Sequence, residues 1–297
     1  MIRVTNVVKK FDNFKALDGL NIQVPKGAIY GLVGPNGAGK STIIRHLAGI
    51  YRQDEGEVCI NGQPVYENSA VKSKIAYIPD DLYFFLQAST KDMMKFYRGI
   101  YKDFDIDRYE KLREVFSIDE NRPMRKLSKG MQKQAAFWLS LCVRPNVMIL
   151  DEPVDGLDPV MRRQVWGLIM GDVAENGTTV LISSHNLREL EDVCDHVGII
   201  HKGRTMLERS LSELQENIVK VQLVLNDGSQ MPDDLHVLHE AKSGKIQTLI
   251  IRGDTEEIAA RIATANPLFY DMVPLTLEEI FIYELGGAEY AVKDILL

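Results

Sequence analysis

The sequence GPNGAGKS at residues 34–41 decides which fold the rest of the chain is expected to adopt. It fits the pattern G-x-x-x-x-G-K-[ST], and it lies between a strand candidate, Ala28–Val33, and a helix candidate, Ser41–Gly49. Glycines let the backbone curl around a phosphate, and the N-terminus of the following helix adds a positive dipole end. We therefore expect Lys40 to neutralise β- and γ-phosphate charge and Ser41 to coordinate Mg²⁺.

The candidate phosphate-binding residues are those of this loop and the residue that follows it: Gly34, Pro35, Asn36, Gly37, Ala38, Gly39, Lys40, Ser41 and Thr42. The alternative interpretation, a glycine-rich turn with a solvated lysine, does not account for the strand before the loop and the helix after it.

A second element is the apolar strand candidate Val147–Leu150, which ends in the adjacent carboxylates Asp151 and Glu152. Open α/β folds bind ligands at the edge where such strands end. Asp151 can hold Mg²⁺ through water, and Glu152 can polarise the water that attacks the γ-phosphate. Alone, the pattern could be a strand that ends at a solvated acidic turn, but its pairing with a phosphate loop favours the catalytic interpretation.

A third element is Leu127–Met131, in which Ser128 can cap a helix that runs towards Cys142. A helix N-terminus can bind an anion. Taken alone, the segment is an ordinary helix start. Its order relative to the first two elements makes it informative.

Together, over roughly residues 1–212, these elements resemble the nucleotide-binding subunit of ATP-binding cassette (ABC) transporters. Residues 34–41 resemble the P-loop of that family and 147–152 its Walker B strand. Leu127–Met131 resembles the signature sequence, which is specific to this family among P-loop ATPases. Gly156–Asp158 resembles the D-loop, and His185 resembles the switch histidine. Phe11 stands where the family stacks an aromatic ring on adenine, with Phe14 as a competing candidate.

The resemblance implies that two ATPase domains pack head to tail, as a homodimer or as a heterodimer with a homologous ATPase. Each ATP would lie between the P-loop of one domain and Ser128 and Gly130 of the other. Glu152 would be the general base, and His185 would contact the γ-phosphate. ATP binding would close the dimer, hydrolysis would release it, and the cycle would drive permease subunits on separate membrane-spanning chains.

Two positions depart from the family pattern. Where the family usually has glutamine after the strand Ile75–Ile78, this chain has Asp80, a further candidate at the Mg²⁺ site. The signature usually has two glycines after its serine, and the first of them is Lys129 here. Similar departures, often with a C-terminal extension, are familiar in bacterial drug, antibiotic-peptide and ABC-2 exporters. The resemblance therefore implies export rather than uptake.

The order of elements predicts an α/β P-loop fold with a mixed sheet, an antiparallel β subdomain and a helical subdomain at about residues 80–145. A change of composition near residue 212 predicts a division into an ATPase domain, 1–212, and a small α+β accessory domain, 213–297. We further expect strands at Ile2–Val4, Leu20–Val24, Val58–Ile60, Thr178–Ser183, Val197–His201, Ile218–Leu225 and Ile246–Ile251. We expect helices at Lys91–Tyr101, Asp107–Phe116, Ser128–Cys142, Val160–Met170, Leu187–Cys194, Glu256–Ala265 and Leu275–Leu285.

Bulk properties limit the partners and the location. The net charge of −7 and the pI of about 5.5 give no sign of the basic face that a large nucleic-acid footprint needs. Three scattered cysteines (Cys59, Cys142 and Cys194) suit neither a metal site nor a disulfide framework, which favours a reducing compartment. We find neither a signal peptide nor an apolar run long enough to span a bilayer, so we expect a peripheral protein at the cytoplasmic face of the cell membrane.

One alternative is a soluble ABC ATPase that acts on DNA or on ribosomes. DNA-repair members place a long coiled coil between the P-loop and the signature, and the chain between Lys40 and Leu127 is too short to hold one. Translation-factor members carry two cassettes in one chain, and this sequence has one. A P-loop kinase, the other alternative, would leave Ser128–Met131 and His185 unexplained.

Overall fold

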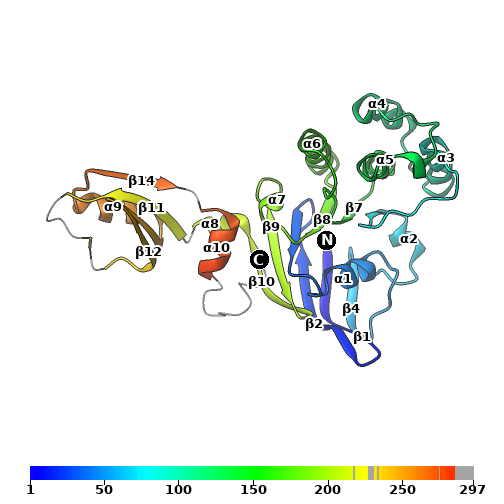
Figure 1. Cartoon of the computed structure of the whole chain (residues 1–297). Coiled ribbons are helices and arrows are strands. Elements are labelled where there is room, and N and C mark those ends of the chain that lie inside the picture. Colours follow the sequence, from blue (N-terminus) through cyan, green and yellow to red (C-terminus); the bar gives the residue numbers. More distant parts are fainter. Residues whose placement is uncertain (217, 227–230, 233, 274, 285–297) are drawn as a thin grey trace. The chain divides into compact units, whose positions relative to one another are not determined.

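The computed structural model describes residues 1–216, 218–226, 231–232, 234–273 and 275–284 (Figure 1). They form two compact units, which we describe separately. The N-terminal unit holds residues 1–185 and 193–208, and the C-terminal unit holds residues 186–192 with the described residues from 209 onward. The expected domains, 1–212 and 213–297, stay a prediction, and residues 285–297 of the second lie outside the described residues.

The N-terminal unit is built on a six-stranded sheet with the order β10-β9-β3-β8-β7-β6. The strands β9, β3, β8, β7 and β6 pair in parallel. Every residue of β3, β7 and β8 is buried, which explains why apolar residues are consecutive in these strands rather than alternating, with polar residues in β7 and β8 confined to the strand ends. The strands are β3 (Ile29–Val33), β6 (Ile75–Ile78), β7 (Val147–Asp151), β8 (Thr179–Ser184), β9 (His196–His201) and β10 (Arg204–Ser210).

A second, antiparallel sheet has the order β2-β1-β4-β5. Its strands are β1 (Ile2–Phe11), β2 (Phe14–Val24), β4 (Glu55–Ile60) and β5 (Gln63–Pro64). The helix α1 (Lys40–Leu47) contacts β7 of the first sheet and β2 and β4 of the second, so it lies between the two. β1 is longer than the expected strand Ile2–Val4, because the pairing with β2 continues after a register shift at the left-handed residue Asn6.

Helices α2 to α6 complete this unit. They are α2 (Ser69–Lys72), α3 (Thr90–Ile100), α4 (Ile106–Phe116), the 3-10 turn η1 (Met124–Lys126), α5 (Lys129–Cys142) and α6 (Pro159–Asn176). Side chains of Ser89, Asp105, Ser128 and Asp158 cap α3, α4, α5 and α6 in turn. The ring of Tyr109 on α4 stacks on that of Trp138 on α5 at 4.5 Å, which joins these two helices in a buried core.

The C-terminal unit contains an antiparallel sheet with the order β12-β13-β11-β14. Its elements are α7 (Arg188–Glu191), α8 (Leu211–Glu216), β11 (Ile218–Val224), β12 (Val237–Ser243), β13 (Ile246–Arg252), α9 (Thr255–Thr264), β14 (Phe269–Val273) and α10 (Leu277–Glu284). The expected helix Leu187–Cys194 shrinks to the four residues of α7, because the chain must turn into β9. The last residue of the expected helix Leu275–Leu285 lies outside the described residues.

Helix α10 begins against α7 through two polar contacts. The Oε1 atom of Glu191 accepts a hydrogen bond from the backbone N–H of Leu277 at 3.0 Å, and Arg188 pairs with Glu278 at 2.9 Å. Leu190 and Leu277 are both fully buried. Of the helices in the described ranges, none is both long and apolar enough to cross a membrane.

A buried ion pair joins α4 to α6, and its removal tests how the helical subdomain is held. The Nη1 atom of Arg108 lies 2.6 Å from Oδ1 of Asp172, whose side chain is 2% exposed. In Arg108→Ala the carboxylate stays buried without its cation, so we expect the free energy of unfolding to fall by about 3 kcal/mol, measured by denaturant titration. The double variant Arg108→Met, Asp172→Leu should recover most of the loss, since no charge remains to be desolvated; an equal loss in the double variant would contradict this account.

Candidate functional site

The phosphate loop follows β3 and opens α1, in the place that the motif predicts. Gly39 has φ 109°, and a Cβ atom there would lie 2.9 Å from the carbonyl oxygen of Ala16, so both backbone angle and space demand glycine. The loop is closed by a hydrogen bond from the N–H of Ala38 to the oxygen of Pro35 at 3.1 Å. The oxygen of Ala38 accepts from the N–H of Gly203 at 2.9 Å, which ties the loop to the turn after β9.

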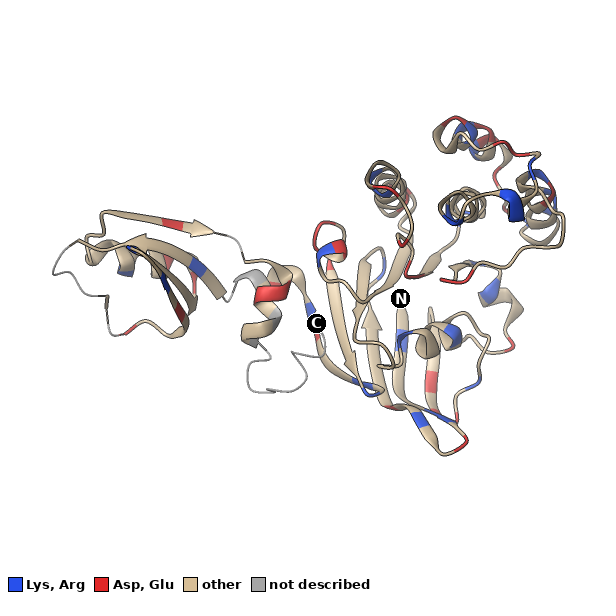
Figure 2. Cartoon of the chain, viewed as in Figure 1, with Lys and Arg blue, Asp and Glu red and all other residues tan. Residues whose placement is uncertain are grey.

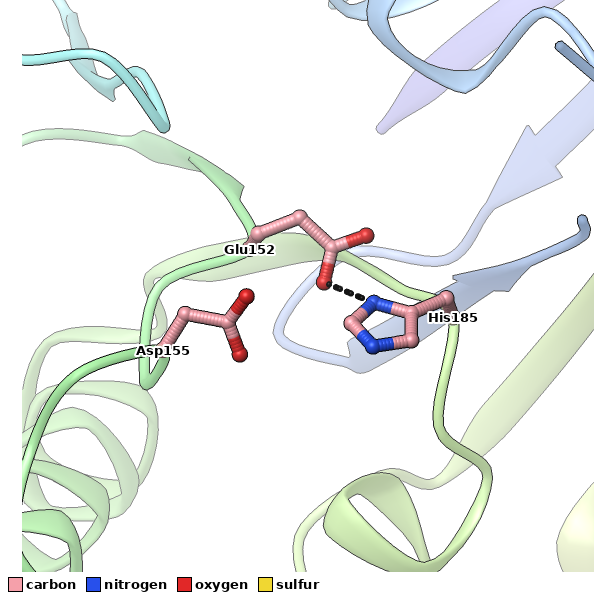
Figure 3. Close-up of side chains that lie close together, drawn as sticks. All are labelled: Glu152, Asp155 and His185. Carbon is pink, nitrogen blue, oxygen red and sulfur yellow. Dashed lines mark hydrogen bonds and ion pairs between the residues drawn. The ribbon is translucent and has the colours of Figure 1, made fainter. Parts of the chain in front are cut away.

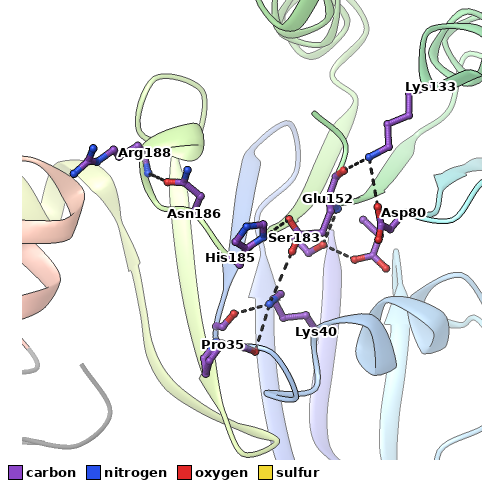
Figure 4. A network of polar contacts seen from close by, with 11 residues as sticks. Pro35, Lys40, Asp80, Lys133, Glu152, Ser183, His185, Asn186 and Arg188 are labelled. Atoms are coloured by element: carbon purple, nitrogen blue, oxygen red, sulfur yellow. Dashed lines mark hydrogen bonds and ion pairs between the residues drawn. The ribbon is translucent and has the colours of Figure 1, made fainter. Parts of the chain in front are cut away.

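Lys40 lies inside this loop as a largely buried cation, with 7% of its surface exposed. Its Nζ donates to the carbonyl oxygens of Gly34 at 2.5 Å and Pro35 at 3.4 Å, and it lies 3.9 Å from Oε1 of Glu152 (Figure 4). Burial lowers the pKa of Lys40, while the charges of Glu152 and Asp151 act in the opposite direction. A partly desolvated ammonium interacts with phosphate oxygens more strongly than a solvated one does.

The two carboxylates at the end of β7 are positioned by Ser183 on the neighbouring strand β8. Asp151 is paired with Ser183 in the parallel register, and its Oδ1 accepts a hydrogen bond from the Ser183 hydroxyl at 2.6 Å. The same hydroxyl oxygen accepts from the N–H of Glu152 at 3.1 Å. Glu152 has φ 46°, in the left-handed region, so its side chain leaves the direction of the strand. Ser183 was not predicted from the sequence, where its only signal is a polar residue at the end of an apolar strand.

Glu152, Asp155 and His185 come together at this edge, with a donor atom from each lying within 4.8 Å of the others (Figure 3). The Nδ1 atom of His185 lies 3.0 Å from Oε2 of Glu152. Burial raises the pKa of Glu152, and the nearby His185 and Lys40 partly oppose this. A carboxylate with a raised pKa beside an imidazole is suited to accept a proton from water. Asp155 was not among the residues expected from the sequence.

Two sets of side chains at this edge could hold a metal ion, and they differ in which metal their ligand atoms favour. Glu152, Asp155 and His185 offer two carboxylates and a ring nitrogen, whereas Mg²⁺ prefers oxygen ligands. Ser41, at the start of α1, and Asp151, which is 4% exposed, offer oxygen ligands only. Their chemistry therefore fits Mg²⁺ better than that of the three-residue cluster.

Helix α5 carries the remaining signature residues. The Ser128 hydroxyl caps its own helix by accepting from the N–H of Met131 at 3.2 Å, and its side chain is exposed. A Cβ atom on Gly130 would lie 2.8 Å from the oxygen of Gly156, so only glycine lets the start of α5 pack this closely on the loop after β7. Lys129 and Asp155 line a cavity of about 360 Å³ at this place.

Asp80 lines the same cavity, two residues after the end of β6, and its side chain is exposed. Its Oδ1 lies 3.5 Å from Nζ of Lys133, a buried lysine on α5 that the sequence analysis did not single out. Lys133 could have been noticed in the sequence as a charged residue shortly before the mostly apolar second half of α5.

The adenine candidate Phe11 ends β1, is 38% exposed and contacts the ring of Tyr51 edge-on at 5.5 Å. Its competitor Phe14 is more exposed, at 63%. Tyr51 is an aromatic neighbour that the sequence analysis missed. The structure thus brings Lys40, Asp151, Glu152 and His185 together, while the nucleotide-contacting roles of Phe11, Ser128 and Gly130 stay predictions.

Comparison with known proteins adds three findings. Residues 17–155 match the family model described as "ABC transporter". The chain is 31% identical to the ABC transporter ATP-binding protein YtrB of Bacillus subtilis, over 97% of this chain and 99% of that protein. It is 33% identical to the bacitracin transport ATP-binding protein BcrA of Bacillus licheniformis, over 97% of this chain and 98% of that protein.

The fold also resembles a solved structure, the dimeric post-hydrolysis state of the ATP-binding cassette MJ0796 bound to ADP and Pi. The similarity has a TM-score of 0.64 at 20% identity, and it covers 71% of this chain and 99% of that one. At this identity the likeness concerns the fold, namely the P-loop architecture described above.

Replacing the loop lysine tests the phosphate site directly. In Lys40→Ala the buried cation that faces the loop carbonyls and Glu152 is gone, and we expect nucleotide binding to be abolished in a fluorescence titration with a labelled ATP analogue. Lys26→Ala, which removes an exposed lysine outside the site, is the control and should bind like the unmodified protein. Micromolar affinity retained in Lys40→Ala would refute the assignment of the loop.

Proposed function

The chain belongs to the ATP-binding subunits of ABC transporters, and we propose that it powers the export of a substrate through permease subunits carried on separate chains. The observation that supports hydrolysis most strongly is the convergence of three side chains at one edge of the sheet: the buried Lys40, the half-buried Glu152 and the exposed His185. Export is supported by the likeness to a protein named for bacitracin transport and by Asp80 and Lys129, the two departures from the usual motifs.

We propose that residues 34–42 wrap the phosphates of ATP and that Lys40 neutralises them. Glu152, whose pKa is raised by burial, accepts the proton of the attacking water. His185, which is held against Glu152 at 3.0 Å, is placed to orient that water or the γ-phosphate. Phe11, with Tyr51 beside it, would stack on the base.

Mg²⁺ fits the oxygen donors of this edge, and we infer that Ser41 and Asp151 hold it. When bound, the ion supplies positive charge to the β- and γ-phosphate oxygens. Ser183 fixes Asp151 by its hydrogen bond at 2.6 Å, as expected for the support of a ligating carboxylate. Asp80 is the third candidate ligand for Mg²⁺, and its carboxylate faces Lys133.

The exposed start of α5 supports a composite site formed by two ATPase subunits. Ser128 and Gly130 lie at a helix N-terminus, where unpaired backbone N–H groups favour an anion. A cassette of the same fold is described as a dimer with ADP and Pi, which supports the same arrangement here. The second subunit would be another copy of this chain or a homologous ATPase.

A contact surface for the permease is supported by apolar side chains exposed after β6 and along α3. Tyr83 is 92% exposed and Leu86 is 80% exposed, and the ring of Phe85 contacts that of Phe96 on α3 at 4.8 Å. Exposed apolar groups gathered in this way are typical of protein–protein interfaces. The patch begins three residues after Asp80, so it is adjacent in sequence to the catalytic edge. We infer from such a contact a location at the cytoplasmic face of the membrane.

The soluble alternative, an ABC ATPase that acts on DNA or ribosomes, is less well supported. Nucleic-acid binding needs phosphate contacts from clustered Lys and Arg. Figure 2 shows basic and acidic residues mixed on the helices of the N-terminal unit, and the net charge is −7.

Glu152→Gln tests the hydrolytic role. The amide keeps the shape of the side chain but cannot accept the proton, so we expect ATP binding to persist and turnover to fall on the order of 10²–10⁴-fold. Phosphate release and ATP binding are measured on the same preparation, with Glu175→Gln, an exposed residue of α6, as the control. Near-normal turnover would remove Glu152 from the mechanism.

The double variant Tyr83→Asp, Leu86→Asp tests the permease surface. Two charges placed in an apolar interface should reduce the fraction of the tagged chain that sediments with membranes of its native cells by about tenfold. ATP binding by the purified variant should be unchanged. The control is Leu268→Asp, which charges another exposed leucine, 68% exposed, in the C-terminal unit; a matching loss in the control would show that the patch has no special role.

A further inference from the structure

Lys133 is a buried lysine, 6% exposed, on the face of α5 that is turned towards the end of β7. Its Nζ donates a hydrogen bond to the carbonyl oxygen of Glu152 at 2.7 Å and lies 3.5 Å from Oδ1 of Asp80 (Figure 4). Taking an ammonium out of water is unfavourable unless partners compensate it, and these two acceptors are the ones that it faces. Lys133 thus connects the signature helix, the end of β6 and the proposed general base.

The backbone of Glu152 shows why a donor is needed here. The left-handed region is unfavourable for a glutamate, so the conformation persists only where the surroundings hold it. Ser183 holds the N–H side, through its hydroxyl at 3.1 Å and its carbonyl at 3.3 Å. Lys133 holds the C=O side. The backbone N–H and C=O groups of Glu152 are therefore both held, one by β8 and the other by α5.

The charges around Lys133 point to a second effect. Asp80, Asp81, Asp155, Lys129 and Lys133 all line the same cavity. With Lys133 present the formal charge of this set is 2 − 3 = −1, and without it the charge is 1 − 3 = −2. Removing the lysine would leave Asp80 without its cation close to the edge where phosphates are proposed to bind.

We propose that Lys133 is a positioning residue of the ATPase: it locks Glu152 in the conformation that directs its carboxylate at His185 and Lys40, and it holds the carboxylate of Asp80 against α5. The proposal rests on the proposed ATP hydrolysis. It assigns no contact between Lys133 and ATP. Its effect is transmitted through the backbone of Glu152 and through the charge of Asp80.

The test compares Lys133→Met, Lys133→Gln and Lys133→Arg with Lys111→Met, which removes an exposed lysine of α4 and is matched in charge. Methionine keeps the volume but cannot donate, glutamine donates without charge, and arginine keeps both properties. We expect kcat to fall by about 10–100-fold in the methionine variant, the size associated with a misplacement of about 1 Å, and ATP affinity to stay within about threefold. The arginine variant should retain most of the activity, with glutamine between the two.

A second readout separates positioning from a loss of stability. The ring resonances of His185, identified from a His185→Gln spectrum, should move in Lys133→Met because Glu152 is no longer held at 3.0 Å from Nδ1. They should stay unchanged in Lys111→Met. If the methionine variant does not fold, the glutamine variant is compared with arginine by the same two measurements.

Asp80→Asn completes the design. Because the unpaired carboxylate causes part of the damage, Lys133→Met should lose less activity in the Asp80→Asn background than it does alone. Unchanged kcat and unchanged His185 resonances in the methionine or glutamine variant would overturn the inference. An unmodified protein that neither binds nor hydrolyses ATP would instead refute the proposed function, so the two failures are distinguishable.

Discussion

The site depends first on the burial of one lysine among backbone carbonyls and carboxylates. Lys40 is 7% exposed, hydrogen-bonds two carbonyl oxygens of its own loop and lies 3.9 Å from Glu152. A cation in that position is attracted by each of these groups, and a phosphate chain offers it a far larger negative charge. Phosphate binding would therefore exchange internal contacts of Lys40 for stronger ones and would free Glu152 to act on water. The same side chain would thus connect nucleotide binding to the state of Glu152, the proposed general base.

The parallel sheet supplies the geometry that this exchange needs. The strands β3, β7 and β8 run in the same direction, so the phosphate loop, the Asp151–Glu152 pair and His185 all follow strand ends at one edge. Ser183 shows how closely the strand register matters, because one hydroxyl contacts both Asp151 and Glu152. On the other side, Gly130 lets α5 approach Gly156, and Lys133 reaches Glu152 from the same helix. Glu152, the proposed general base, is therefore held by the sheet and by helix α5 at once.

Local motifs made much of this predictable from the sequence. The loop at 34–41 and the apolar run that ends at Asp151 and Glu152 carry their chemistry in consecutive residues, and the family resemblance and the P-loop fold are confirmed. The roles of Ser183, Lys133 and Asp155 depend instead on which strand or helix lies beside them, which spacing along the chain does not reveal. Exposed strands such as β12 and β14 carry too little apolar alternation to be recognised. The length of helix α7 was overestimated, because the chain turns into β9 before the helical sequence pattern ends.

The central claim, that this ATPase works on a membrane transporter, is tested most directly by capture in the ATP-bound state. The tagged protein with glutamine at position 152 is loaded with ATP in detergent-solubilised native cells, and its partners are identified by mass spectrometry. The account predicts a multi-span membrane protein, alone or with a second ATPase subunit. Ribosomal proteins or DNA-processing enzymes, with no membrane protein, would contradict the transport role while leaving the ATPase site intact.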